Sequence, residues 1–263
     1  DHQFTWEQSG FQAAEATLRR TVIVQGDRVG RYQEALHVPE QWERDFATLR
    51  SGNELYAAIA NGLYVLLVAV ALLLLLLNLR QRIIPWRPLL RIAGLVSAFY
   101  FLNELNTLAF AVDRMPTSTR YPEMLILSIL QGLGAAAGVL IYVLTPAAAG
   151  VGYRLPFAMP GSRGYFRAAV AGYGMAGAHM IFLTAFYLYG AQWGVWSPQE
   201  VDYSDLLATP LPWVYPIAIA LMASAAEEFW FRWLAIPLME GAVRLRWLAI
   251  VIPAFVWGFL HAN

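Results

Sequence analysis

Six long apolar segments constrain this chain more than any other feature of its sequence. They cover residues 58–79, 88–112, 122–148, 167–192, 211–238 and 247–263, and each is near the ~20 residues that a helix needs to cross a bilayer. The chain is 59% hydrophobic and only 14% charged, which is too apolar for an ordinary soluble domain. We therefore expect an all-α, polytopic transmembrane helix bundle, with six helices visible in this sequence and more outside it.

Residues 1–56 are the only conventionally polar stretch, and we expect a small soluble region there. Their pattern predicts a helix near residues 5–20 and a short strand from Thr21 to Gln25, which Gly26 and Asp27 stop. A second helix is expected to start at Pro39 and to run on into the membrane. The next expected domain, residues 57–166, holds three accessory transmembrane helices and the loop that follows them.

Arginine distribution predicts the orientation of the helices, because arginine-rich loops stay on the cytoplasmic side. Arginines gather in the loops near residues 80–91, 154–167 and 244–246, whereas the alternate loops are mixed or acidic. Residues 1–56 are then extracytoplasmic. Because such a region needs something to export it, we expect a further transmembrane helix before Asp1.

The composition also excludes several kinds of function. The formal net charge is zero, and no basic patch suggests a nucleic-acid partner. The chain has no cysteine, so disulfides, thiolate metal sites and cysteine nucleophiles are all ruled out. The partner that the sequence does predict is the lipid bilayer.

Three charged residues, Glu227, Glu228 and Arg232, lie near the middle of the fifth apolar segment. In one interpretation the helix ends at Ala226 and the charges belong to an aromatic belt at the membrane surface. However, residues 211–226 span only about 24 Å at 1.5 Å per residue, which is short of the ~30 Å hydrocarbon core. The apolar run also resumes at Trp233. We therefore expect the charges to lie inside the membrane, where ionisable groups are usually functional.

The spacing of these charges suggests a different part for each glutamate. Glu228 and Arg232 are four residues apart on one helical face, with the acid first, which favours an ion pair. Glu227 lies about 100° around the helix and lacks that partner. A carboxylate beside a like charge in a low dielectric is suited to act as a general base toward water.

His261, in the sixth segment, is a second candidate for the same site. The fifth and sixth segments are joined by a short loop, so they should be antiparallel neighbours. Glu227 and His261 then lie at the same depth to within about one turn. A glutamate and a histidine placed in this way can share a water molecule or bind a metal ion.

These residues resemble the CAAX-prenyl-protease and bacteriocin-processing (CPBP) intramembrane proteases. The family pattern is EExxxR on one membrane helix, FxxxH on the next, and a second histidine on a later helix, often followed four residues on by asparagine. The stretch from Glu227 to Arg232 matches the first motif fully. Trp257 to His261 matches the second, with tryptophan in place of phenylalanine. The third motif is expected beyond Asn263.

The resemblance implies a role for each matched residue. Glu227 corresponds to the base that activates the hydrolytic water, and His261 corresponds to its helper. Glu228 and Arg232 correspond to a supporting ion pair, with Trp257 one turn before the histidine. No cofactor is expected, although a divalent metal such as zinc stays an alternative, since two visible ligands do not complete a zinc site. Residues 167–263 are then the catalytic core.

The leading hypothesis is an intramembrane endopeptidase that hydrolyses a peptide bond of a membrane-associated protein or peptide. The resemblance also suggests a multi-pass protein of the cell membrane, in particular the bacterial inner membrane. One alternative is a non-catalytic scaffold or immunity protein that keeps the motif for stability. Another is an ion-coupled transporter that uses Glu227 or Glu104 as a proton site.

Overall fold

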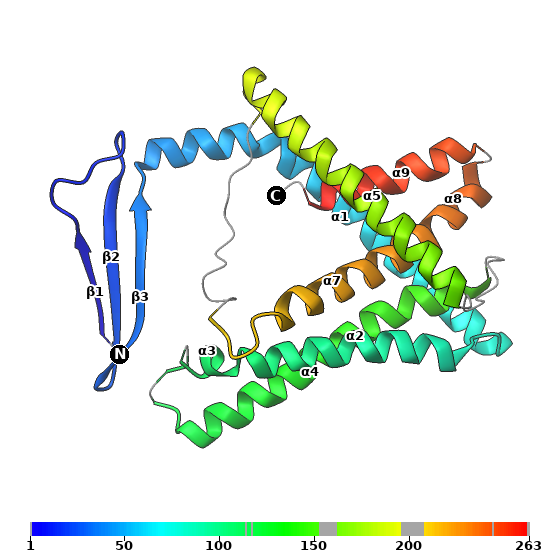
Figure 1. Ribbon diagram of the computed structural model, residues 1–263, viewed down its shortest axis with the longest axis horizontal. Helices are drawn as coiled ribbons and strands as arrows, with labels where there is room; N and C mark the ends of the chain where they lie inside the picture. The colour runs from blue at the N-terminus through cyan, green and yellow to red at the C-terminus, as the bar shows by residue number, and fades with distance from the viewer. Residues whose placement is uncertain are drawn as a thin grey trace. The chain divides into compact units, whose positions relative to one another are not determined.

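The computed structural model describes residues 2–113, 115–116, 118–152, 162–195, 208–243 and 245–261 (Figure 1). Packing divides the chain into two compact units, residues 1–153 with 206–263 and residues 154–205. Apart from one small sheet, the described elements are helices, which confirms the predicted all-α transmembrane bundle. The candidate site lies in the larger unit.

The amino-terminal region is an antiparallel sheet of three strands in the order β1 (His2–Glu7), β2 (Thr17–Gln25) and β3 (Arg28–His37). The predicted strand and its stop are confirmed, since Gly26 takes the positive φ of 63° that the tight turn to β3 requires. The predicted helix near residues 5–20 is wrong. In the register, Phe4 pairs with Val22 and Val22 with Tyr32, so apolar side chains share one face of the sheet.

Helix α1 (Glu40–Gln81) runs without interruption from Pro39 into the apolar segment, as the sequence predicts. It ends where Arg82 adopts the left-handed conformation and its backbone N–H bonds back to Asn78 and Leu79. Helix α2 (Trp86–Asn106), the short α3 (Leu108–Asp113) and α4 (Tyr121–Ala149) follow, and a turn of 3-10 helix, η1 (Gly150–Gly152), extends α4.

The fifth apolar segment is helical from Val214 to Val243, although its middle is not an α-helix. It consists of α7 (Val214–Glu227), the π-helix η3 (Glu228–Ala235) and α8 (Ile236–Val243), and α9 (Arg246–Leu260) then packs against α8. The interpretation in which the helix ends at Ala226 is therefore wrong. The smaller unit contains α5 (Ser162–Gly190) and the short 3-10 helix η2 (Ala191–Trp193).

The core of the larger unit is built from α1, α2, α4, α7 and η3. Most of its buried side chains are small, which lets the helix backbones approach closely, as is usual in membrane proteins. Two larger side chains of η3, Trp230 and Leu234, fill the remaining space. The buried core residues are Ala71, Ala93, Val96, Val143, Ala149, Ala226, Trp230 and Leu234. One side of η3 is therefore packed into this core.

Within the described residues, four helical stretches are long and apolar enough to cross a membrane. They are Glu40–Gln81, Tyr121–Gly152, Arg163–Trp193 and Val214–Val243. The chain is therefore a multi-pass membrane protein. The prediction of six crossing helices is too high by this measure, because α9 has only 15 residues and α2 carries charged residues, Arg87, Arg91 and Glu104, along its length.

Candidate active site

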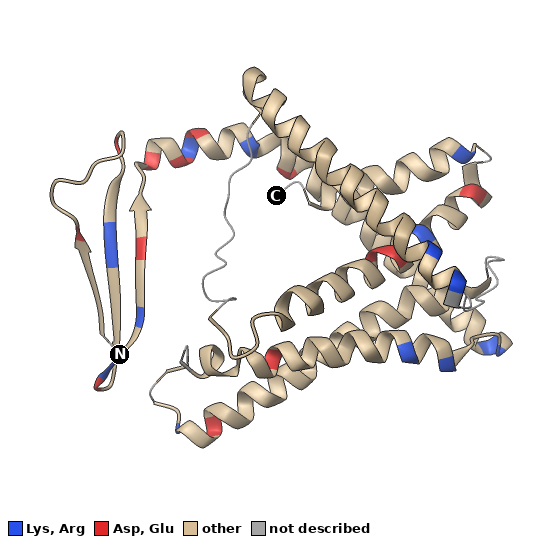
Figure 2. Cartoon of the chain, viewed as in Figure 1, with Lys and Arg blue, Asp and Glu red and all other residues tan. Residues whose placement is uncertain are grey.

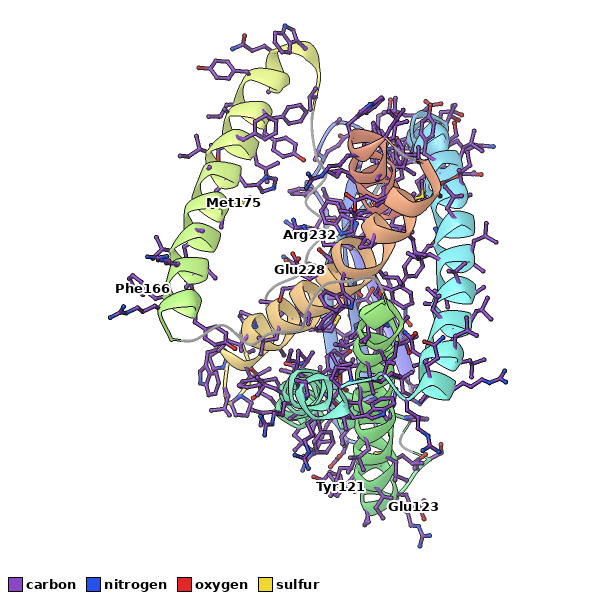
Figure 3. All side chains as sticks on the ribbon, turned by 90° about the vertical axis from the view of Figure 1, so that its right-hand side faces the viewer. Tyr121, Glu123, Phe166, Met175, Glu228 and Arg232 are labelled. Atoms are coloured by element: carbon purple, nitrogen blue, oxygen red, sulfur yellow. The ribbon has the colours of Figure 1, made fainter. Side chains whose placement is uncertain are left out.

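Glu228 and Arg232 form the ion pair that their spacing predicts. Arg232 Nη1 donates to Glu228 Oε1 across one turn of η3. Figure 3 shows both side chains on the same side of the segment. Each is substantially exposed, Glu228 to 51% and Arg232 to 69%. The guanidinium is thereby committed to Glu228.

Glu227 is the last residue of α7, immediately before the π-helix, and its side chain is half-buried. Among the described residues, no hydrogen bond or ion pair engages its carboxylate. Among the described residues the two neighbouring glutamates therefore differ: Glu228 is paired with arginine, whereas the carboxylate of Glu227 has no such partner.

Both glutamates open onto one cavity of about 250 Å³. Its polar end is formed by Glu227, Glu228 and Arg232, and its apolar wall by side chains of η3, α8 and α9: Phe231, Ile236, Ile250, Pro253, Ala254 and Trp257. A cavity with a few converging polar groups on an otherwise apolar surface is typical of a substrate site. The space is large enough for part of a peptide together with a water molecule.

His261 lies one turn beyond Trp257, at the carboxyl end of α9. Its ring packs against the Trp257 ring, with centroids 4.8 Å apart, and Nδ1 is 2.8 Å from the Trp257 carbonyl oxygen. Because a carbonyl oxygen only accepts, Nδ1 is the donor in this contact. The contact fixes the orientation of the ring and leaves Nε2 outside it.

The structure brings four of the five predicted site residues to one cavity, but His261 is not among the described residues that line it. The predicted sharing of a water molecule between Glu227 and His261 therefore stays a prediction. Within the described residues, no three histidine, aspartate or glutamate side chains converge as metal ligands do. The choice between a mechanism with and without metal is untested.

The sequence analysis did not predict the aromatic packing on the buried side of η3. Trp230 is 2% exposed and packs edge-on against Tyr64 of α1, with ring centroids 5.3 Å apart. Tyr142 of α4 lies 5.8 Å from the same indole, and its hydroxyl is 3.0 Å from that of Tyr64. The aromatic residues that crowd between Glu228 and Trp233 could have indicated this packing, since large rings at a helix crossing need partners.

Glu104, the alternative proton site, lies near the carboxyl end of α2. Gly132 of α4 packs closely against it, and a Cβ at this glycine would be 3.0 Å from the Glu104 Cβ. Two residues along α2, Asn106 donates to Thr209 and to the carbonyl of Leu211. This part of α2 packs against α4 and the segment before α7, whereas the cavity of Glu227 is lined by η3, α8 and α9.

The segment that lines the cavity also carries the similarity to known proteins. Residues 209–263 match the family model of Rce1-like type II CAAX prenyl endopeptidases. This match confirms the resemblance that the two motifs indicate. Every residue that lines the cavity falls inside the Rce1-like segment. No curated protein and no solved structure gave a match.

Proposed function

We propose that this chain is an intramembrane endopeptidase that hydrolyses a peptide bond of a membrane-associated protein or peptide, with Glu227 as the general base. The observation that carries the proposal is the cavity of the Rce1-like segment, where the carboxylate of Glu227, without a partner among the described residues, lies beside the Glu228–Arg232 pair. A base without a competing partner can take a proton from water at such a place.

The proposed chemistry needs only groups of this chain and water. Glu227 removes a proton from a water molecule, the water oxygen bonds to the peptide carbonyl carbon, and the C–N bond then breaks. The proton passes to the leaving amine. Arg232 holds the carboxylate of Glu228 in an ion pair, and His261 assists through Nε2. The apolar wall excludes bulk water from the reacting bond.

The test compares Glu227→Gln with the parent protein in cells that express either one. Chain termini of membrane proteins are profiled by mass spectrometry, which requires no knowledge of the substrate. We expect new termini with the parent protein and none with Glu227→Gln, because the amide cannot take the proton. Loss of a general base typically lowers the rate about 10²- to 10⁴-fold.

The matched control is Glu240→Gln, which removes an acid of α8 whose partner is Arg246 at 3.6 Å. It should cleave as the parent does. Identical termini with and without active Glu227 would contradict the proposal and favour a non-catalytic scaffold. Proton flux in proteoliposomes that disappears with Glu227→Gln would favour a transporter.

Substrate chemistry is tested with two quenched fluorescent peptides of one sequence in proteoliposomes, one farnesylated and one unmodified. The name of the matched family describes endopeptidases of prenylated CAAX sequences, whereas we propose that this chain cleaves the unmodified peptide. We also expect cleavage to persist after treatment with a strong zinc chelator. Loss of activity that added zinc restores would show a metal mechanism instead.

A further inference from the structure

The carboxyl end of α4 is buried, and side chains from two other helical segments bind its last carbonyl groups. Ala147, Ala148 and Ala149 are at most 2% exposed. Asn78 of α1 donates from Nδ2 to the carbonyls of Ala148 and Ala149, at 3.0 and 2.9 Å. Trp233 of η3 donates from Nε1 to the carbonyl of Ala147, at 3.1 Å. The carbonyls that a helix leaves unpaired at its end therefore receive donors.

Gly150 makes the approach of Trp233 possible. A Cβ at this position would lie 2.3 Å from Cδ1 and 2.4 Å from Nε1 of the indole. The backbone of Gly150 has an ordinary helical φ of −73°. The requirement for glycine is thus one of space, and the space is filled by the ring that donates the hydrogen bond.

Trp233 directly follows Arg232 in the π-helix. Trp230 packs against Tyr64 and Tyr142, so η3 contacts both α1 and α4. Between helices in lipid, packing and hydrogen bonds provide the specificity, since the hydrophobic effect does not favour one apolar neighbour over another. A directed hydrogen bond from an indole fixes the rotation of the segment about its axis, which smooth apolar packing leaves free.

We propose that Trp233 is a positioning residue: its hydrogen bond to Ala147, in the space left by Gly150, holds the π-helix so that Glu227, Glu228 and Arg232 face the wall of α9. This inference rests on the proposed function, because it concerns the same cavity. Trp233 itself does not line the cavity and acts through its neighbours. Through this bond, the carboxyl end of α4 determines the orientation of Glu227 and Glu228.

The test compares two tryptophans of one segment. Trp233→Phe keeps an aromatic ring but removes the N–H that bonds to Ala147. Trp230→Phe makes the same chemical change in the same π-helix, but the buried Nε1 of Trp230 has no hydrogen-bond partner among the described residues. Both variants lose the pyrrole part of an indole, and among the described residues only Trp233→Phe also loses a hydrogen bond.

A geometric readout separates this proposal from the proposed function. The chain has no cysteine, so Ile236→Cys with Ile250→Cys places a unique thiol pair on the two sides of the cavity. We expect cross-linking by a short bismaleimide to be slower in Trp233→Phe and unchanged in Trp230→Phe. This result is obtained whether or not the protein cleaves peptides.

Cleavage of the unmodified fluorescent peptide provides the second readout. For Trp233→Phe we expect kcat to fall about tenfold or more, because a misplacement of about 1 Å is costly to catalysis, while KM stays within about twofold because the apolar wall is intact. Equal cross-linking in the two variants would overturn the proposal. Absence of cleavage by the parent protein would overturn the proposed function alone.

Gly150→Ala provides the independent variant if Trp233→Phe fails to fold in detergent. Its methyl group displaces the indole without changing Trp233 itself. We expect slower cross-linking again, whereas parental cross-linking in a folded Gly150→Ala protein would contradict the proposed role.

Discussion

At the scale of single residues, the ion pair shows how much local spacing can predict. Glu228 and Arg232 meet because residues four apart share a helical face, and this relation survives the change from α- to π-helix. The apolar wall of the cavity was not predictable in the same way. Ile250, Pro253 and Ala254 reach it only because the chain turns between α8 and α9. Contacts of that kind depend on the packing of two helices.

A double-mutant cycle on the ion pair measures where it lies relative to the membrane. We compare Glu228→Gln, Arg232→Gln and the double variant by the free energy of unfolding in mixed micelles. Exposed pairs in water contribute about 0.2–1 kcal/mol, whereas removal of one partner of a buried pair costs about 3–5 kcal/mol. For an intramembrane pair we expect single variants near the larger values and partial recovery in the double variant.

The same cycle can contradict an intramembrane location. Coupling below about 0.5 kcal/mol that disappears in high salt would place the pair at the wet surface. Glu240→Gln, which breaks the exposed pair with Arg246, provides the reference for such a weak interaction.

At the scale of elements, the amino-terminal region shows where sequence patterns mislead. Residues 5–20 contain several alanines and glutamates, which favour helix. The structure instead pairs β1 with β2 and β2 with β3. The partners of the first pair are distant in sequence, as His2 is from Val24, so their favourable cross-strand contacts are invisible to a local pattern. The π-helix was missed for the same reason, since its hydrogen-bonding pattern depends on how its large rings pack.

The sheet also gives a prediction about pH. The pKa of Glu34 lies below its usual value, first because the Tyr32 hydroxyl donates to the carboxylate, and second because Arg20 donates at 2.7 Å. A carboxylate with a lowered pKa stabilises the fold above its unfolded pKa, and this contribution is lost as pH falls through the folded value. We expect the sheet to loosen in acid below about pH 4.

Tyr32→Phe tests this prediction, since it removes the donor and leaves the ring. The pKa of Glu34, followed by carboxyl-carbon NMR of labelled protein, should rise toward its ordinary value. Thr21→Val, which changes a residue of β2 bonded to Thr5 on the other face, should leave it unchanged. An unaltered pKa in Tyr32→Phe would show that the hydroxyl does not stabilise the carboxylate.

At the scale of the whole molecule, basic and acidic residues lie toward opposite ends of α2 in the larger unit. Figure 2 shows basic residues gathered where α1 connects to α2, and acidic residues toward the far end of α2 and the start of α4. Hydropathy alone could predict the helical segments, because their length is set by the bilayer. It could not predict which helices carry the core, which is a matter of side-chain fit.

The absence of cysteine makes the predicted orientation directly testable. We place single thiols at Gln41 and Gln81, near the two ends of α1. A maleimide that does not cross membranes should label Gln41→Cys in intact cells and Gln81→Cys only after permeabilisation, because residues 1–56 are proposed to be extracytoplasmic. The opposite labelling pattern would invert the topology.

The π-helix between α7 and α8 restricts how this protein can change during evolution. A π-helix bonds each N–H to the carbonyl five residues back, one more than in an α-helix. A π-helix also turns through a smaller angle per residue, so deletion of one residue between Glu228 and Ala235 would let the α-helical pattern resume with α8 at about its present rotation relative to Glu227. Loss of a second residue would turn α8 by about 100° relative to Glu227, so changes larger than one residue should be tolerated only in the loops on either side and not within these eight residues.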